Sequence, residues 1–297
     1  MNTLAPVAPP DEVQHLLNTA TRIETPCGDA ALVWHVWGQG GAEDAPVVLL
    51  HGGSGSWTHW LHNILPLTST GRRVLVPDLP GFGDSAAPAK GTDADALPDP
   101  IEAGLKTLLG DQVCDLVGFS FGGMVAGFLA AKFPERVARL VIVGAPGLGV
   151  ASRRTITLTP WRHLADAGQR DAIHRQNLAA LMLHQPDSIT ELALRLHVAN
   201  VVRDRMKGRS LAHTDALARA LRQVRCPVYA IYGREDALYR GRLDALAEAL
   251  RPAHDFKGLQ LIEDAGHWVQ FERPQLFNAA LLTVLNGGHP PAIGAHQ

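Results

Sequence analysis

The chain has 297 residues, of which 46% are hydrophobic and 19% are charged, and its 27 Lys and Arg side chains nearly balance its 29 Asp and Glu side chains. This composition is typical of a globular protein with a large core, built as one elaborated domain or as two. Since neither sign of charge dominates, we expect no nucleic-acid partner.

The cysteines and the first ten residues indicate the cellular compartment of the protein. Cys27, Cys114 and Cys226 are an odd number and widely spaced, which argues against a disulfide framework or a zinc site and favours buried, reduced thiols. Residues 1–10 lack the features of a signal peptide, and no later run reaches the ~20 apolar residues of a membrane span. We therefore expect a cytoplasmic protein with no membrane partner. A homodimer is compatible with the sequence, which does not decide the oligomeric state.

Short apolar runs alternate with helix-like segments through much of the chain. The runs predict strands at residues 22–25, 30–37, 47–50, 73–77, 113–117, 137–143, 226–232 and 258–262, the first two antiparallel. Helical patterns occupy residues 57–67, 100–109, 124–130, 239–250 and 273–285. This alternation predicts an α/β protein with a mostly parallel, doubly wound sheet.

The sequence pattern changes between residues 151 and 222, where Arg, His, Leu and Ala recur at helical spacing and no strand-like run is found. We interpret this segment as a helical lid inserted over the carboxyl edge of the sheet. The core then comprises residues 21–150 and 223–286, with loosely ordered tails at 1–20 and 287–297.

The lid carries an excess of basic side chains in a slightly acidic protein. Most of these side chains belong to solvated helix faces. Arg195, Arg203 and Arg205 are the candidates for binding an anionic group of a substrate.

The segment 118–122 reads Gly-Phe-Ser-Phe-Gly and stands between a predicted strand and a predicted helix. This is the G-x-S-x-G nucleophile elbow in the strand-turn-helix context that it requires. The glycines leave room for a strained turn that projects Ser120 from the edge of the sheet. A serine hydroxyl is a poor nucleophile alone, so this interpretation requires a base, an acid and oxyanion donors elsewhere in the chain.

A second glycine-rich segment, His-Gly-Gly-Ser-Gly at residues 51–55, follows the strand predicted at 47–50. Such a loop leaves backbone N–H groups free to point at a developing negative charge. A dinucleotide-binding turn is disfavoured because the G-x-G-x-x-G spacing is not met and no acidic residue follows at the expected distance.

With these motifs in place, the chain resembles the α/β-hydrolase superfamily from residue 22 to residue 285. The resemblance rests on five segments in the family's order, at residues 51–55, 78–85, 118–122, 233–236 and 266–268. It implies an α/β-hydrolase fold and a serine hydrolase. By position, Ser120 is the nucleophile, His267 the base and Asp236 the carboxylate that holds the imidazolium, with Glu235 and Asp264 as rivals of Asp236.

The resemblance also implies the oxyanion donors. They are the backbone N–H of Phe121, which follows the nucleophile, and that of Gly53 or its neighbour Ser54. His51 braces the loop in this family. We expect no cofactor and no metal, because the histidines show neither H-E-x-x-H spacing nor cysteine partners.

Two subgroups of the family compete for the substrate. Lidded carboxylesterases need only the residues above, with an apolar pocket built from Phe119, Phe121, Trp57 and the lid. Meta-cleavage-product hydrolases, which cut a carbon–carbon bond in 2-hydroxy-6-oxo-dienoates, have a similar segment around His267 and Trp268, and bind the substrate carboxylate with a lid arginine, near Arg195 here.

Two differences from the carbon–carbon bond hydrolases favour an ester as the substrate. Ser54-Gly55-Ser56 stands where the carbon–carbon hydrolases usually have Gly-Pro-Gly, and Phe119 stands where they have Asn. We therefore expect hydrolysis of a carboxylic ester of small to medium size and apolar character. A third alternative is a member of the fold that binds a ligand without turnover, or that acts as a cofactor-free perhydrolase or oxygenase.

Overall fold

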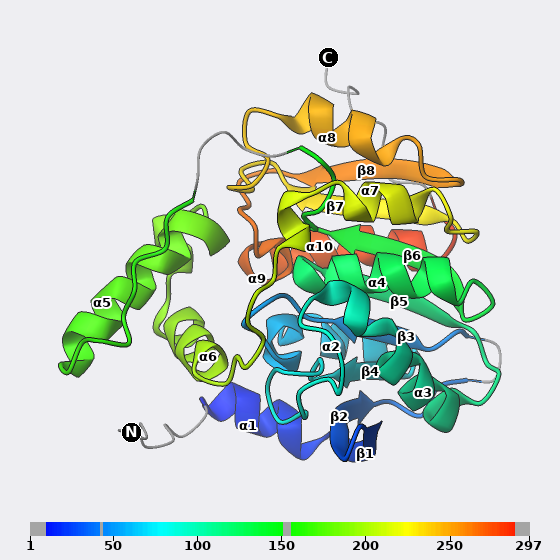
Figure 1. The fold of residues 1–297 in the computed structure, drawn as a ribbon, viewed down its shortest axis with the longest axis horizontal. Helices are drawn as coiled ribbons and strands as arrows, with labels where there is room; N and C mark the ends of the chain where they lie inside the picture. Colours follow the sequence, from blue (N-terminus) through cyan, green and yellow to red (C-terminus); the bar gives the residue numbers. More distant parts are fainter. Residues whose placement is uncertain (1–9, 42–43, 151–155, 289–297) are drawn as a thin grey trace.

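The computed structural model describes residues 10–41, 44–150 and 156–288. Its centre is an eight-stranded sheet with the order β1-β2-β4-β3-β5-β6-β7-β8, in which β1 and β2 are antiparallel and β3 to β8 are parallel to one another (Figure 1). The strands are β1 (Thr21–Cys27), β2 (Ala30–Trp37), β3 (Val47–Leu50), β4 (Val74–Pro77), β5 (Cys114–Phe119), β6 (Val137–Val143), β7 (Val228–Gly233) and β8 (Phe256–Ile262). The predicted α/β class and mostly parallel sheet are confirmed.

Both faces of the sheet are covered by helices. Successive side chains of a strand point to opposite faces, so Val48 and Leu50 of β3 belong to one hydrophobic cluster, and Val47 and Leu49 to the other. The first cluster includes α3 (Pro98–Leu109), α4 (Phe121–Lys132), α7 (Ala216–Leu221) and α8 (Leu243–Leu250). The second includes α2 (Ile64–Thr68), α9 (Val269–Glu272) and α10 (Pro274–Leu285).

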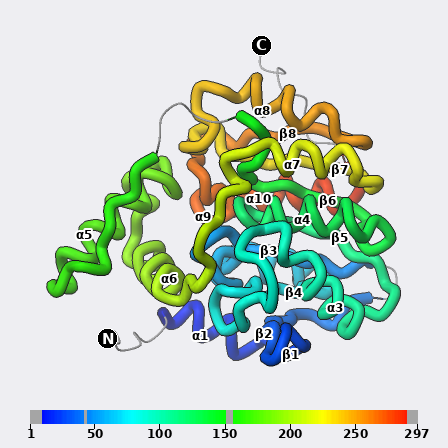
Figure 2. Tube along the Cα trace, viewed as in Figure 1, coloured from blue at the N-terminus to red at the C-terminus, as the bar shows by residue number. Residues whose placement is uncertain are grey.

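The segment between β6 and β7 divides into two parts. Helices α5 (Ala167–Asn177) and α6 (Glu191–Val201) lie beside the layered core rather than within it (Figures 1 and 2). In contrast, α7 packs against α4 through the buried Leu217 and Leu221. The sequence placed α7 with the inserted segment, because helical spacing alone does not tell which partner a helix packs against.

The amino-terminal arm also differs from expectation. Residues 11–18 were predicted to be loosely ordered, but they form α1 (Asp11–Asn18), whose Val13 and Leu16 are buried. The indole N–H of Trp37 donates to the carbonyl oxygen of Leu16 at 3.0 Å, which fixes the helix to β2. The tail predictions for residues 1–9 and 289–297 lie outside the described residues. No helix in the described part of the chain is long and apolar enough to cross a membrane.

Candidate active site

The predicted elbow lies between β5 and α4. Ser120 has φ 51° and ψ −117°, a strained conformation for a residue with a side chain. A Cβ atom on Gly118 would lie 2.3 Å from the carbonyl oxygen of Gly122, and one on Gly122 would lie 2.4 Å from that of His51. The tight turn therefore excludes side chains at both positions, and it leaves Ser120 partly exposed at the carboxyl edge of the sheet.

Two hydrogen bonds join Ser120, His267 and Asp236. His267 Nε2 lies 2.9 Å from Ser120 Oγ, and His267 Nδ1 lies 2.9 Å from Asp236 Oδ2. Asp236 is fully buried, and its other oxygen accepts a hydrogen bond from the Leu238 N–H at 2.9 Å. Among the described contacts, neither Glu235 nor Asp264 bonds to the imidazole.

The sheet topology explains how these residues meet. Ser120 follows β5, Asp236 follows β7 and His267 follows β8, and the carboxyl ends of parallel strands lie at one edge of a sheet. Tyr232 and Tyr239 line the same edge, where their hydroxyls donate to the Ala145 carbonyl oxygen at 3.0 and 2.6 Å. Burial raises the pKa of both tyrosines well above its usual value, so they remain neutral donors.

The glycine-rich loop after β3 lies beside the elbow. His51 braces it, since its Nε2 accepts from the Leu79 N–H at 2.8 Å and its Nδ1 lies 2.7 Å from the Gly52 carbonyl oxygen. Neither the Gly53 N–H nor the Phe121 N–H has a hydrogen-bond acceptor in the described part of the chain. Both predicted donors are therefore available to a ligand.

Ser54 adopts a left-handed conformation, with φ 50°. Its hydroxyl donates to Asp204 at 2.5 Å, so its side chain connects the glycine-rich loop to the end of the inserted segment. The side chain thus braces the loop.

Glu272 is a buried carboxylate that the sequence analysis did not single out. It accepts hydrogen bonds from the N–H groups of Gly266 at 2.6 Å, His184 at 2.9 Å and Gln185 at 2.7 Å. The Trp268 N–H also donates to the Met182 carbonyl oxygen at 2.7 Å. The loop that carries His267 is therefore held against the inserted segment. The only sequence signal was the acidic residue that ends the His-Trp-Val-Gln-Phe-Glu run.

Phe119 and Trp268 of the predicted site are both buried, and only Phe119 has a described contact with the hydrogen-bonded array. The Phe119 ring packs against the His267 ring with centroids 5.1 Å apart, and it has no exposed surface. Trp268 is 1% exposed, and its indole N–H donates to the His59 carbonyl oxygen at 3.0 Å. The Phe119 ring therefore supports the imidazole from within the core, while Trp268 is anchored to His59.

Two further predicted residues have their described contacts away from Ser120 and His267. The Trp57 ring packs against His35 and Trp37, with centroids 5.3 and 5.5 Å apart, and its described contacts include none with Ser120 or His267. Arg195 lies on the exposed side of α6, where it pairs with Glu191 at 2.9 Å. The register of the helix, which the sequence left open, turns Leu196 inward instead.

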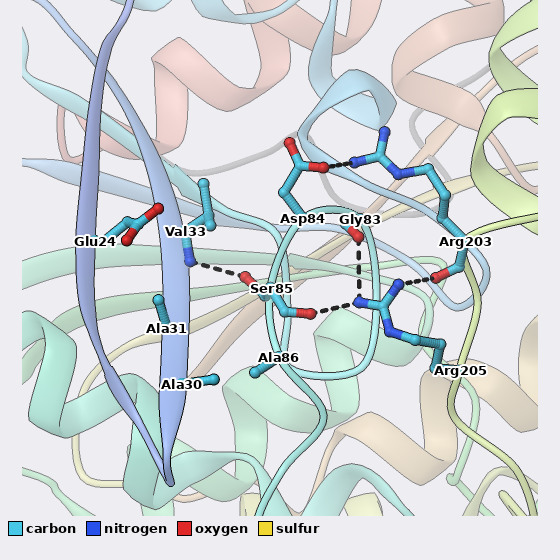
Figure 3. A pocket seen from close by; sticks show the side chains of 10 residues that line it. All are labelled: Glu24, Ala30, Ala31, Val33, Gly83, Asp84, Ser85, Ala86, Arg203 and Arg205. Atoms are coloured by element: carbon cyan, nitrogen blue, oxygen red, sulfur yellow. Dashed lines mark hydrogen bonds and ion pairs between the residues drawn. The ribbon is translucent and has the colours of Figure 1, made fainter. Parts of the chain in front are cut away.

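Arg203 and Arg205 lie in a pocket whose lining residues do not include Ser120, His267 or Asp236. They line this pocket of about 550 Å³ together with Glu24 and the loop at residues 83–86 (Figure 3). Arg203 pairs with Asp84, while Arg205 donates to the carbonyl oxygens of Gly83 and Ser85. Both cations are thus occupied in bracing this loop.

The space between the core and α6 contains histidines that burial keeps neutral. Burial, together with nearby histidines, lowers the pKa of His59 well below its usual value. Burial also lowers the pKa of His197 on α6 to about 4. The ring of His197 stacks edge-on against His174, with centroids 5.2 Å apart. No cluster of three or more His, Cys, Asp or Glu suited to a metal ion is found among the residues that the structure describes.

The chain belongs to the alpha/beta hydrolase family, whose model matches residues 47–280. Its sequence is 28% identical over 266 residues to a 2-hydroxy-6-oxo-6-phenylhexa-2,4-dienoate hydrolase from Burkholderia cepacia, a match that covers 84% of this chain and 90% of that protein. The chain is thus similar in sequence to a hydrolase of a 2-hydroxy-6-oxo-dienoate over most of its length.

The fold is shared with solved hydrolases of both predicted subgroups. Carboxylesterase CesB from Bacillus subtilis superposes with a TM-score of 0.72 at 20% identity, covering 93% of this chain and 96% of that one. The meta-cleavage product hydrolase CumD from Pseudomonas fluorescens superposes with a TM-score of 0.68 at 25% identity, covering 89% and 97%.

The contacts of Glu272 generate a first prediction. Glu272→Gln removes the charge that three N–H groups share, so we expect the free energy of unfolding to fall by about 1–3 kcal/mol. Urea denaturation measures this change. The matched control is Glu263→Gln, because Glu263 forms an exposed pair with Arg234 and its loss changes stability by less than ~1 kcal/mol. Equal effects of the two substitutions would contradict the role of Glu272.

The lowered pKa of His197 generates a second prediction. Because the pKa of His197 is lowered from 6.5 to about 4, the unfolded chain binds a proton that the folded chain excludes within that interval. The free energy of unfolding should therefore fall as the pH is lowered from 6.5 toward 4. His197→Gln should reduce this slope in urea titrations at several pH values, whereas His254→Gln, at an exposed position, should leave it unchanged. An unchanged slope in the His197 variant would contradict the assignment.

Proposed function

We propose that this protein is a serine hydrolase in which Ser120, His267 and Asp236 form the catalytic triad. The observation that carries the proposal is the His267 imidazole, which bridges Ser120 Oγ and Asp236 Oδ2 at 2.9 Å on each side. His267 takes the proton of Ser120 as its oxygen attacks a carbonyl carbon, then delivers it to the leaving group. Asp236 holds the imidazolium in place, and water releases the acyl group by the same steps.

The negative charge that develops on the carbonyl oxygen requires fixed donors. We assign this role to the N–H groups of Phe121 and Gly53, with the Ser54 N–H as the alternative to Gly53. The free N–H groups described above support this assignment. The proposal needs no metal and no cofactor.

We favour a carboxylic ester as the substrate. Phe119 makes the elbow apolar, α6 turns Leu196 inward with Arg195 on its exposed side, and His59 and His197 are neutral. The α6 side of the site is therefore uncharged, which suits the apolar part of an ester. An ester of small to medium size, apolar where it meets α6, fits these surroundings.

The sequence similarity favours a second candidate. The relative from Burkholderia cepacia hydrolyses a 2-hydroxy-6-oxo-dienoate according to its name, and it matches 84% of this chain. The same triad would serve that reaction, in which a carbon–carbon bond is cleaved next to a carbonyl group.

We further propose that the helices α5 and α6 form a lid over the site. The support is the anchoring of residues 182–185 to the His267 loop by Glu272 and Trp268. A small molecule is then the expected partner, and the cytoplasmic location and homodimer remain predictions of the sequence.

Labelling and substrate preference test the proposed function. A fluorophosphonate probe should label the wild type and not Ser120→Ala, with circular dichroism as the control for folding. p-Nitrophenyl acetate should be hydrolysed in preference to 2-hydroxy-6-oxohexa-2,4-dienoate. Absence of labelling in folded protein would favour a role without hydrolysis, whereas a preference for the dienoate by several orders of magnitude would favour the second candidate.

Asp236→Asn tests the acid separately. The amide cannot stabilise the imidazolium, so turnover should fall by about 10⁴-fold while the folded structure is retained. Glu235→Gln serves as the matched control, since Glu235 makes no described bond to His267, and it should remain close to wild-type activity. The assignment fails if Asp236→Asn keeps near-wild-type turnover.

A further inference from the structure

Arg209 lies against the two residues assigned as oxyanion donors. A Cβ atom added to Gly53 would lie 2.8 Å from Arg209 Nη1 and 3.5 Å from Phe121 Cβ. The guanidinium carbon also lies 5.5 Å from the centre of the Phe121 ring and 5.3 Å from that of Phe82. A positive charge therefore lies next to the two residues whose N–H groups are assigned to the substrate carbonyl oxygen.

Only part of the guanidinium is paired. Nη2 donates to Asp204 at 2.8 Å and to Ser54 Oγ at 3.5 Å. Nη1 is buried and has no hydrogen-bond partner in the described part of the chain. A buried, unpaired nitrogen of a charged group is unfavourable, because it has lost its water without gaining an acceptor.

The hydrogen bonding of Arg209 contrasts with that of Arg136, a buried arginine with a structural role. All three of its nitrogens are paired, with Glu102 and with the carbonyl oxygens of Gln112 and Gly110. Such saturation is the usual state of a buried arginine. The unpaired Nη1 of Arg209 instead lies next to Gly53, one of the two residues assigned as oxyanion donors.

We propose that Arg209 binds a carboxylate of the substrate, a few atoms from the carbonyl that Ser120 attacks. This inference rests on the proposed hydrolase function and adds a substrate class to it: an ester that bears one carboxylate. The planar guanidinium matches a carboxylate in shape, and charge-assisted hydrogen bonds of this kind are the stronger ones. The carboxylate would replace the missing acceptor of Nη1 and complete its pairing.

The position of the guanidinium allows this role. Residues 204–209 have no regular secondary structure, and the Arg209 side chain is 25% exposed, so it can turn toward a ligand without repacking a helix. Asp204 neutralises the side of the guanidinium that faces Ser54 and leaves the side at Gly53 available. Arg195, Arg203 and Arg205 are engaged elsewhere, as described above.

Paired esters test the proposal and locate the carboxylate. The mono-p-nitrophenyl ester of glutaric acid, compared with p-nitrophenyl hexanoate, places the charge on the acyl side. para-Acetoxybenzoate, compared with its methyl ester, places the charge on the alcohol side.

We expect the wild type to prefer the charged member of at least one pair, and Arg209→Gln to lower kcat/KM for that member by about 10- to 100-fold. The neutral members serve as the internal reference: the ratio of kcat/KM for the charged ester to that for its neutral partner isolates the charge-assisted contact from any change in the Gly53 and Phe121 backbone on which Arg209 packs. Arg209→Lys should retain part of the preference, and Arg219→Gln, at an exposed pair on α7, should retain all of it.

Direct binding separates this inference from the proposed function. Glutarate and benzoate should bind the wild type in calorimetry and bind Arg209→Gln at least about tenfold more weakly, whether or not esters are turned over. If the probe labels Ser120 and neutral esters are hydrolysed, but neither charged ester nor acid depends on Arg209, the inference is overturned and the hydrolase function stands. If labelling and turnover fail while the acids still bind through Arg209, the carboxylate site stands and the hydrolase function is overturned.

Discussion

The register of the parallel strands is the constraint on which the site depends. Ser120 and His267 are 147 residues apart in the chain, and Asp236 and His267 are 31 apart, yet each pair meets within hydrogen-bond distance. This is achieved because β5, β7 and β8 end at one edge, with β6 between β5 and β7. A slip of one residue in any of these strands would turn its side chains to the opposite face and separate the three groups.

The inserted segment is part of this geometry rather than an addition to it. Glu272 binds N–H groups of the His267 loop and of the insertion with the same carboxylate, and Trp268 reaches the insertion through its own N–H. The Phe119 ring packs against the imidazole, and the Trp268 indole is anchored to His59 next to it. The position of His267 is therefore determined jointly by the sheet and by the inserted segment to which its loop is bound.

Local patterns were sufficient to predict the strands and the elbow with Ser120, because each rests on a short motif in a strand-loop context. The choice of Asp236 and His267 came instead from the resemblance to the α/β-hydrolase superfamily. The other contacts join distant residues of ordinary type: Glu272 pairs with His184, 88 positions away, and Arg209 with Ser54, 155 positions away. No local pattern distinguishes such residues from their neighbours. Arg195 shows the same limit in another form, since a shift of one position on a helix decides whether a charge faces the site or the solvent.

Asp204 links the backbone of the glycine-rich loop to the nearby cation. It accepts the hydroxyl of Ser54, which holds a left-handed conformation beside Gly53, and it pairs with Arg209, which packs on Gly53 and Phe121. Ser54 Oγ and Arg209 Nη2 both bond to the same oxygen of Asp204. The direction of the neighbouring Gly53 N–H and the position of the guanidinium therefore depend on each other. A carboxylate that draws Arg209 toward itself would loosen its pair with Asp204 and strengthen the hold of Asp204 on Ser54. Binding of the charged group and alignment of the proposed oxyanion donor would then support each other through the Asp204 side chain.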